Sequence, residues 1–384
     1  MLFKPVKTFV LAGLCAGMLI SSCEKTYDDT VYGPGNPDPN PTGSNPASVS
    51  GISPSEGFLK EVLTISGSGF DSNPDNNLVQ FGNRVGEVVS ASPTQIEVIA
   101  PNLQDDTVGV RVAVKGAELW SNPVSFYFLP TLNSIDTETV NPKGVAVDDS
   151  GNVYFGGADA GEIYKVTPDG DRSFFAAYPI NGAMEFGPGG WLWVCDQGNN
   201  EIARISPDGS TIETVVQDTT MAPVDFDWHA SGDLYIVGNG QGVFRYDGST
   251  VTQLAFLENA KSLRIFEDKL YVTDIWANRI MDYDISGGTL INENVFLEYD
   301  PPPVGIEVDE EGTVYFSPAW STSLVAIYSD GSEEILYEDQ LLTPMRYLTF
   351  YDKTMYIVYP GFGDIGEVMS AYIGVRQAPN HGRQ

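Results

Sequence analysis

The chain has 384 residues, enough for about two or three domains, and 42% of them are hydrophobic, with 19 Tyr and 19 Phe. Its 52 acidic residues outnumber 20 basic ones and leave a formal charge of −32, so a nucleic-acid backbone or an anionic lipid surface is a poor partner. The aromatic content excludes an acidic disordered chain, and we expect a folded protein whose acidity serves solvation.

The first 22 residues have the pattern of a secretory signal. Two lysines precede an apolar run from Phe9 to Ile20, which is too short to span a bilayer stably. The run ends in the letters LISSC, which resemble a bacterial lipobox. That resemblance implies that residues 1–22 are a lipoprotein signal peptide, cleaved before Cys23, and that the Cys23 thiol is lipidated. Ordinary secretion with a chance cysteine is the alternative.

Residues 23–48 form a segment rich in Gly, Pro, Asn and Ser. Such a segment buries little and extends by about 3.1 Å per residue where it is polyproline-like, so we expect a lipidated stalk. Glu24 and Asp28-Asp29, close to the lipidation site, resemble the surface-export signal of Bacteroidota lipoproteins. This resemblance implies an outer-membrane protein that faces the cell exterior; attachment to the periplasmic face is the alternative.

Residues 49–129 are rich in short alternating segments and end where the repeats begin. About seven such strands in one short unit favour an immunoglobulin-like sandwich. The segments are, in order, Ile52–Gly57, Val62–Phe70, Val79–Gly82, Ile96–Pro101 and Val108–Lys115. They resemble the IPT/TIG domain over nearly its whole length, and the resemblance implies a spacer or a docking module.

Residues 130–376 repeat a unit of four short strands, and an aromatic residue opens the second strand of each unit. These anchors are Tyr154, Trp193, Tyr235, Tyr271, Tyr315 and Tyr356, spaced by 39, 42, 36, 44 and 41 residues. A period near forty residues with period-two alternation is typical of propeller blades. We therefore predict an all-β chain in which the sandwich is followed by a six-bladed β-propeller and a polar tail, residues 377–384.

The last unit has no fourth strand of its own after Glu367–Ile373. The segment Thr131–Thr139 lies before the first unit and has no partner there. We predict that it completes the last blade and closes the ring; the alternative is that it is a linker.

The units resemble NHL-repeat propellers. The first unit carries the resemblance through Pro142-Lys143-Gly144, Asp148–Tyr154 and Glu162–Lys165. It is specific for the fold and not for an activity, because propellers host many unrelated functions.

Residues suited to catalysis are scarce. Histidine occurs only as His229, in a turn, and as His381, in a tail that we expect to fray, so a histidine metal site or a Ser-His-Asp relay lacks its base. Cys195 lies in an apolar strand and is expected to be a buried structural residue. We expect no catalytic residue, no cofactor and no metal site. Several acidic residues lie in turns, where we expect solvation: Asp148, Asp149, Asp309 and Glu310.

The loops between second and third strands differ between the two halves of the ring. In the last three blades these loops hold large aromatic residues: Trp276, Trp320, Tyr359 and Phe362. Trp276 and Trp320 each stand five residues after their anchors, so they are expected at matching places on adjacent blades. We interpret these rings as a half-moon platform for the apolar faces of sugars. The alternative is that each ring covers its own blade or fills the gap to the next.

Polar groups are expected opposite this platform. The hydrogen-bonding candidates are Asp159, Asp196, Asn199, Asn239 and Asp274. The cations expected near the starts of first strands, where they could contact acidic sugars, are Lys143, Lys261 and Arg346. Calcium in the acidic loops is an open alternative, although no spacing resembles an EF-hand.

These features favour a lipid-anchored cell-surface binding protein that holds an oligosaccharide or polysaccharide. By resemblance, its analogues are accessory glycan-binding lipoproteins of TonB-dependent importers, so an outer-membrane importer is an expected partner. One alternative is a protein–protein interaction scaffold at the outer membrane. Another is a propeller hydrolase or lyase that uses a carboxylate pair on carbohydrate.

Overall fold

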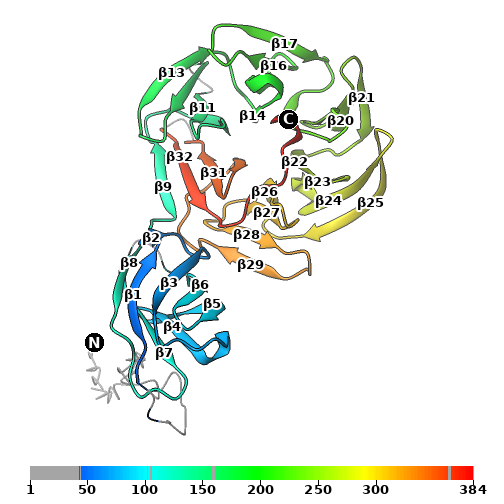
Figure 1. The fold of residues 1–384 in the computed structure, drawn as a ribbon. Helices are drawn as coiled ribbons and strands as arrows, with labels where there is room; N and C mark the ends of the chain where they lie inside the picture. The colour runs from blue at the N-terminus through cyan, green and yellow to red at the C-terminus, as the bar shows by residue number, and fades with distance from the viewer. Residues whose placement is uncertain are drawn as a thin grey trace, which may run out of the picture. The chain divides into compact units, whose positions relative to one another are not determined.

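The computed structural model describes residue 43 and residues 45–101, 103, 106–157, 161–361 and 365–383, which form two compact units divided after Phe128 (Figure 1). The expected signal peptide, the lipidation site Cys23 and nearly all of the stalk lie outside the described residues. In the described part, no helix has the length and apolarity needed to cross a membrane.

The first unit is a β-sandwich, as the sequence predicts. Its strands in the described residues are β1 (Ser48–Ser53), β2 (Glu56–Gly57), β3 (Val62–Ser68), β4 (Asn77–Phe81), β5 (Arg84–Ser92), β6 (Gln95–Ile99), β7 (Asp106–Val114) and β8 (Val124–Phe128). They are ordered β1-β3-β6-β5-β4-β7-β8-β2, so that β5 belongs to both layers. The core between the layers includes Phe81, Phe126 and Phe128, whose rings meet edge to face.

A glycine lets β5 pass from one layer to the other. The start of β5 pairs with β4 through Gly86, and the rest pairs with β6. A Cβ on Gly86 would lie 2.7 Å from a methyl of Val98 and 2.9 Å from the ring of Phe81. Because any side chain would displace core atoms, this bend requires glycine.

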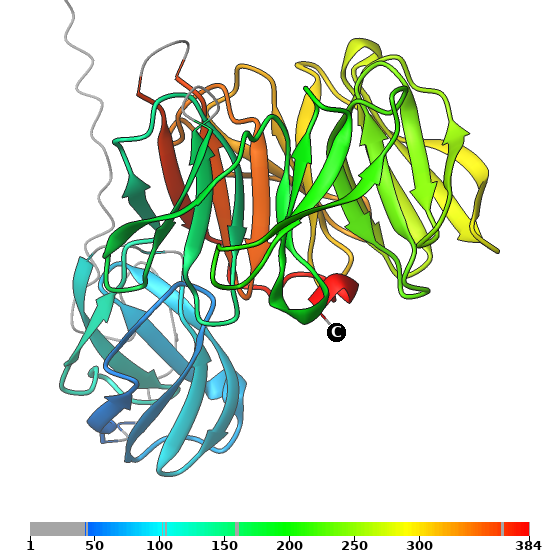
Figure 2. The same cartoon turned by 90° about the horizontal axis from the view of Figure 1, so that it is seen from above.

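The second unit is a six-bladed β-propeller in which each blade is a four-stranded antiparallel sheet (Figures 1 and 2). Blade 1 consists of β10 (Pro142–Val147), β11 (Val153–Gly157), β12 (Glu162–Val166) and β13 (Arg172–Ala177). Blade 2 consists of β14 (Met184–Phe186), β15 (Leu192–Asp196), β16 (Glu201–Ile205) and β17 (Ile212–Gln217). Blade 3 consists of β18 (Pro223–Trp228), β19 (Leu234–Gly238), β20 (Gly242–Tyr246) and β21 (Val251–Ala255). Blades 4 and 5 are β22 (Ala260–Phe266), β23 (Lys269–Asp274), β24 (Arg279–Ser286) and β25 (Thr289–Glu298); and β26 (Pro303–Val308), β27 (Val314–Pro318), β28 (Leu324–Ile327) and β29 (Glu333–Leu336). Blade 6 is β30 (Tyr347–Tyr351), β31 (Thr354–Tyr359), β32 (Glu367–Tyr372) and β9 (Leu132–Asp136).

The predicted closure of the ring is confirmed. Strand β9, which comes before blade 1 in the chain, pairs antiparallel with β32, with Ser134 opposite Met369. The expected strand Thr131–Thr139 thus supplies the outer strand of the last blade. Closure leaves each blade packed between two neighbours, so that the inner strands are largely buried, whereas outermost strands such as β13 and β25 stay largely exposed.

The anchor residues are held by the turns before them. In blade 1, Asp148 accepts hydrogen bonds from the backbone N–H of Asn152 (2.9 Å) and from the hydroxyl of Tyr154 (3.0 Å). In blade 5, Asp309 accepts the corresponding bond from Tyr315 at 2.8 Å. The expectation that Asp309 is solvated is wrong: it is 0% exposed, because the turn and the anchor ring fold around its carboxylate.

The loops of the propeller lie at two ends. We call "upper end" the one with the loops from second to third strands and from each fourth strand to the next blade. The "lower end" has the turns from first to second strands. In Figure 2 the upper end is at the top and the C-terminal segment crosses the lower end.

The C-terminal segment packs on the ring instead of fraying. The Ala378 N–H donates to the carbonyl of Val308 at 3.0 Å. Arg383 binds the carboxylate of Asp149 at 3.0 Å. His381 begins the last short helical turn, so the expectation of a frayed tail is wrong for the residues that the structure describes. Backbone hydrogen bonds to blades 5 and 6, which local composition does not reveal, order this segment.

Candidate functional site

Two tryptophans project from the upper end of adjacent blades. Trp276 lies in the single turn Ile275–Ala277 of blade 4 and is 73% exposed. Trp320 follows β27 of blade 5, is 69% exposed and has a φ of +63°. Rings this exposed add little to the core, and a non-glycine residue at positive φ costs on the order of 1–3 kcal/mol. Both rings are therefore free to contact a ligand.

The other two aromatic candidates differ from these. Tyr359 is only 4% exposed and packs in the core shared by blades 5 and 6, against Leu341 and Met345 among others. It fills the gap between blades, the alternative that the sequence left open, and is not exposed to a ligand. Phe362 lies outside the described residues, as does the acidic candidate Asp159.

Two acidic candidates are occupied by their own loops. Asp196 is 1% exposed and accepts hydrogen bonds from the Asn199 side chain (2.7 Å) and from the Gly198 N–H (2.9 Å). Asp274 is 6% exposed and forms an ion pair with Arg279 at 3.0 Å. Both carboxylates shape loops of the upper end, and Asn199 is oriented by Asp196.

Three cations lie at the upper end near the starts of inner strands. Lys261, at the start of β22, donates to Asn239 Oδ1 at 2.6 Å, which joins two predicted site residues on neighbouring blades. Burial and the positive charge of Arg346 lower the pKa of Lys261. Arg346 is exposed, and Lys143 is half-buried at the start of β10. The upper end thus has positive charge in a strongly acidic protein.

Sequence reasoning missed several exposed apolar residues at the same end. They are Val140, Phe256, Leu342 and Ile365, which are 42%, 68%, 46% and 60% exposed. All except Ile365 lie in loops from a fourth strand to the next blade. The order of the strands could have predicted this location. Because strands alternate in direction, these loops lie at the same end as Trp276 and Trp320.

A charged cluster inside the ring was also missed. Arg264 on β22 contacts Asp225 on β18 at 3.0 Å and Glu307 on β26 at 2.7 Å, and all three are buried from solvent or nearly so. Asp227 accepts from the Ile265 N–H at 2.8 Å. Inner strands read as apolar runs with occasional charges, and nothing in the sequence pairs charges from different blades.

Burial raises the pKa of the carboxyl groups in this cluster. The pKa of Glu307 is raised to about 7 and that of Asp227 to about 6, and in both cases Arg264 opposes the rise. Burial and the negative charge of Asp227 also raise the pKa of Glu185. Within the described residues, no group of three or more His, Cys, Asp or Glu is arranged to hold a metal ion.

Two other residues lie where the sequence suggested. Cys195 is a free, fully buried thiol, and burial raises its pKa well above the usual value. His229 lies in its turn, with ring nitrogens 2.9 Å from Ser231 Oγ and 3.0 Å from Asp268 Oδ1. Both residues are explained by packing and turn geometry.

Comparison with known proteins assigns the first unit. The family model of the IPT/TIG domain matches residues 47–128. This sandwich is an IPT/TIG domain. No curated protein matches the chain.

Solved structures resemble this chain in fold. An auxiliary nutrient binding protein from Bacteroides ovatus is 13% identical, with a TM-score of 0.51, over 86% of this chain and 99% of that one. A gluconolactonase from Xanthomonas campestris is 18% identical, with a TM-score of 0.53, over 63% of this chain and 89% of that one. The calcium-binding protein regucalcin from Agrobacterium tumefaciens is 16% identical, with a TM-score of 0.54, over 64% of this chain and 95% of that one. At these identities the similarity shows the fold alone.

Proposed function

We propose that this protein is a cell-surface binding protein that holds a glycan at the upper end of its propeller. The observation behind the proposal is the pair Trp276 and Trp320, 73% and 69% exposed on adjacent blades. Sugars present apolar C–H faces and hydroxyl edges, and aromatic planes beside amide and charged groups suit both. Asn239, Lys261 and Arg346 supply such groups at the same end.

The charge at this end favours an acidic sugar. Lys261 is held by a neutral amide, and Arg346 is near enough to lower its pKa. Two cations that repel one another are stabilised when a carboxylate or sulfate binds between them. A binding role is also supported by the fold shared with auxiliary nutrient binding proteins of Bacteroides.

A glycan array on the purified chain tests this function. Trp276→Ala and Trp320→Ala are each expected to weaken a retained oligosaccharide roughly tenfold, the loss of about 1.4 kcal/mol of ring contact. The free energy of unfolding should change by less than about 0.5 kcal/mol, because both side chains are exposed. Phe174→Ala is the matched control, since Phe174 is a 57% exposed ring on the outer strand β13. Unchanged glycan affinity in both tryptophan variants would contradict the proposal.

The cellular location is part of the same proposal. A lipid on Cys23 would anchor the chain in the outer membrane, and the stalk would hold the folded units outside the cell. The protein would there be accessory to a TonB-dependent importer. We expect Cys23→Ser to move the protein from the membrane fraction to the soluble fraction and to remove the mass of the acyl chains. A membrane-bound Cys23→Ser variant, or accessibility to protease only after cell lysis, would contradict the lipid anchor or the exterior location respectively.

A hydrolase is the second candidate, because gluconolactonases share the fold and the ring contains carboxyl groups of raised pKa. The same array distinguishes the two candidates. Cleavage of a retained oligosaccharide, abolished by Glu307→Gln, would establish hydrolysis, whereas retention of intact sugar supports binding.

A further inference from the structure

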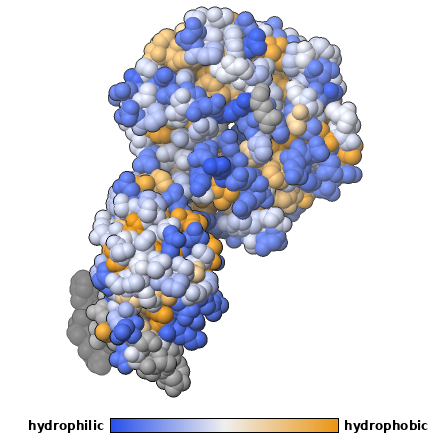
Figure 3. Space-filling view, viewed as in Figure 1, coloured by the Kyte–Doolittle hydropathy of each residue, from blue (hydrophilic) through white to orange (hydrophobic). Residues whose placement is uncertain are grey.

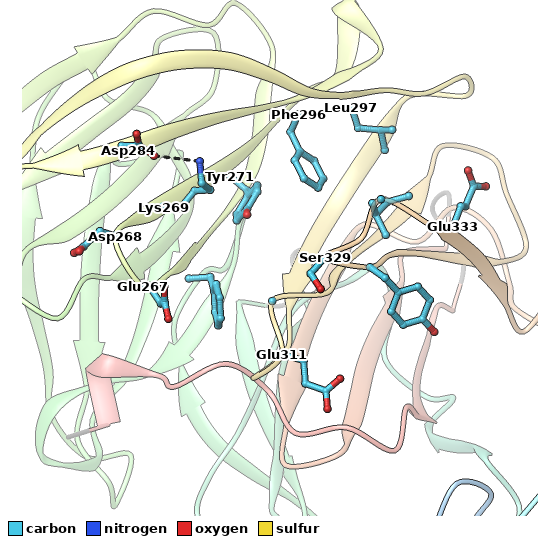
Figure 4. A pocket seen from close by; sticks show the side chains of 15 residues that line it. Glu267, Asp268, Lys269, Tyr271, Asp284, Phe296, Leu297, Glu311, Ser329 and Glu333 are labelled. Carbon is cyan, nitrogen blue, oxygen red and sulfur yellow. Dashed lines mark hydrogen bonds and ion pairs between the residues drawn. The ribbon is translucent and has the colours of Figure 1, made fainter. Parts of the chain in front are cut away.

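Blades 4 and 5 differ in the length of their outer strands. In blade 4, β24 has 8 residues and β25 has 10, whereas β28 and β29 of blade 5 have 4 each. The long hairpin therefore extends past the short one, and a cleft of about 640 Å³ lies between them (Figure 4). Sites for organic ligands commonly have about 300–1,000 Å³, so this cleft is large enough for several side chains.

The inner wall of the cleft is aromatic and aliphatic. Tyr271 and Phe296 of blade 4 meet edge to face, with ring centroids 5.1 Å apart. Phe296 and Leu297 are only half-buried, and Ile327 and Tyr328 line the opposite side. Apolar surface in a recess of this kind favours a ligand with an apolar part.

The rim of the cleft is strongly acidic. Its carboxylates are Glu267, Asp268, Asp284, Glu311 and Glu333. Among the described residues that line the cleft, Lys269 is the one cation. It is already bound to Asp282 at 2.6 Å and to Asp284 at 3.1 Å, and the contact with Asp284 is drawn in Figure 4. In the part of the chain that the structure describes, the carboxylates of Glu267 and Glu311 have no hydrogen bond or ion pair. A cationic group is the complement to this rim.

Strand β25 also offers backbone groups. It is the outermost strand of blade 4, and Phe296 and Leu297 on it border the cleft. Ile291 and Val295 on the same strand are 44% and 45% exposed. A long edge strand with exposed apolar residues presents unpaired N–H and C=O groups to an incoming extended segment.

We propose that the cleft between blades 4 and 5 binds an extended basic segment of a partner protein, with arginine or lysine at the rim and apolar neighbours on the aromatic wall. This occupant uses the three features together: carboxylates, apolar wall and open strand edge. A small amine would use only the rim, and an acidic sugar would be repelled by it. The site is separate from the upper end and does not depend on glycan binding.

Fluorescence anisotropy on the purified full chain tests the proposal. The probe is a short labelled peptide that alternates arginine with leucine, compared with its glutamate counterpart and with spermidine as competitor. The arginine peptide is expected to bind, and added salt should weaken it because the rim is exposed. Glu267→Gln combined with Glu311→Gln should lower affinity roughly three- to tenfold, as expected for two exposed charge pairs. Ser329→Trp, which fills the cleft without changing charge, should lower it as well.

Asp169→Asn combined with Glu138→Gln is the matched control, because it removes two exposed carboxylates on other blades. Unchanged affinity in this control, together with losses in the cleft variants, supports the proposal. Equal binding of the glutamate peptide, equal affinity in the Glu267 and Glu311 double variant, or complete displacement by spermidine at equal concentration would overturn it.

Discussion

Arg264 connects the inner strands of several blades. Its guanidinium contacts Asp225 at 3.0 Å and Glu307 at 2.7 Å, and donates to the Leu348 carbonyl at 3.3 Å. A buried ion pair of this kind stabilises a fold modestly, but loss of one partner leaves an uncompensated buried charge. The cluster is therefore first a structural element of the ring, and any chemistry would have to work within it.

Glu307 contributes to the pH dependence of stability, together with Asp227 and Glu185, whose pKa values are raised in the same cluster. The pKa of Glu307 is about 7 in the folded protein and about 4.3 in an unfolded chain, so the folded state binds this proton more tightly. Its contribution to stability is full below about pH 4 and is lost as pH rises to about 7. This loss is on the order of 3 kcal/mol. We expect Glu307→Gln to make it smaller, as measured by urea unfolding at several pH values. An unaltered slope between pH 4 and 7 in the variant would show that Glu307 is not its source.

At the scale of elements, β9 closes the ring and a salt bridge secures its end. Asp136, with a side chain 1% exposed, binds Arg172 of blade 1 at 2.8 Å and accepts from the Thr139 N–H at 2.9 Å. The Arg172 guanidinium also lies 3.7 Å above the ring of Tyr164. The closing strand of blade 6 is thereby attached to the next blade as well as to β32.

Asp136→Ala is expected to lower the free energy of unfolding by roughly 2–4 kcal/mol, because it removes a buried carboxylate and leaves the donors of that carboxylate without an acceptor. Glu213→Ala is the matched comparison: it breaks the Arg204–Glu213 pair, whose side chains are 35% and 45% exposed, and should cost less than about 1 kcal/mol. Urea unfolding of the two variants measures the difference. Equal losses would mean that the β9 salt bridge adds nothing beyond a surface pair.

At the scale of the molecule, charge is the dominant property. Hydrophilic residues cover much of the propeller surface in Figure 3, with small separate hydrophobic patches. The formal charge of −32 implies repulsion between surface carboxylates. Such repulsion is largely screened over distances beyond about 8 Å at an ionic strength near 0.15 M.

We therefore expect the melting temperature to rise when sodium chloride is raised from a few millimolar to about 0.15 M, as measured by calorimetry. A fall over this range would mean that attractive surface pairs outweigh the general repulsion. Sodium sulfate at matched ionic strength is the control for ion-specific effects.

Individual residues of the candidate site were harder to predict than the blades around it. Trp276 and Tyr359 were both predicted in loops between second and third strands, but Tyr359 is the last residue of β31 and is 4% exposed, whereas Trp276 lies in the turn after β23 and is 73% exposed. Asp196 looked like a ligand for a sugar and instead holds Asn199 at 2.7 Å. Local sequence places a residue in a loop but does not say which neighbours from other blades will cover it.

The sequence by itself determined the architecture: alternation, turn residues and the spacing of anchors from Tyr154 to Tyr356 are local or periodic signals, and they specify six blades and the strand that closes them. Only the tertiary structure decided which side chains are exposed, which charges meet inside the ring around Arg264, and where unequal strands leave a cleft. Those properties depend on contacts between residues far apart in the chain, and a pattern along the chain does not contain them.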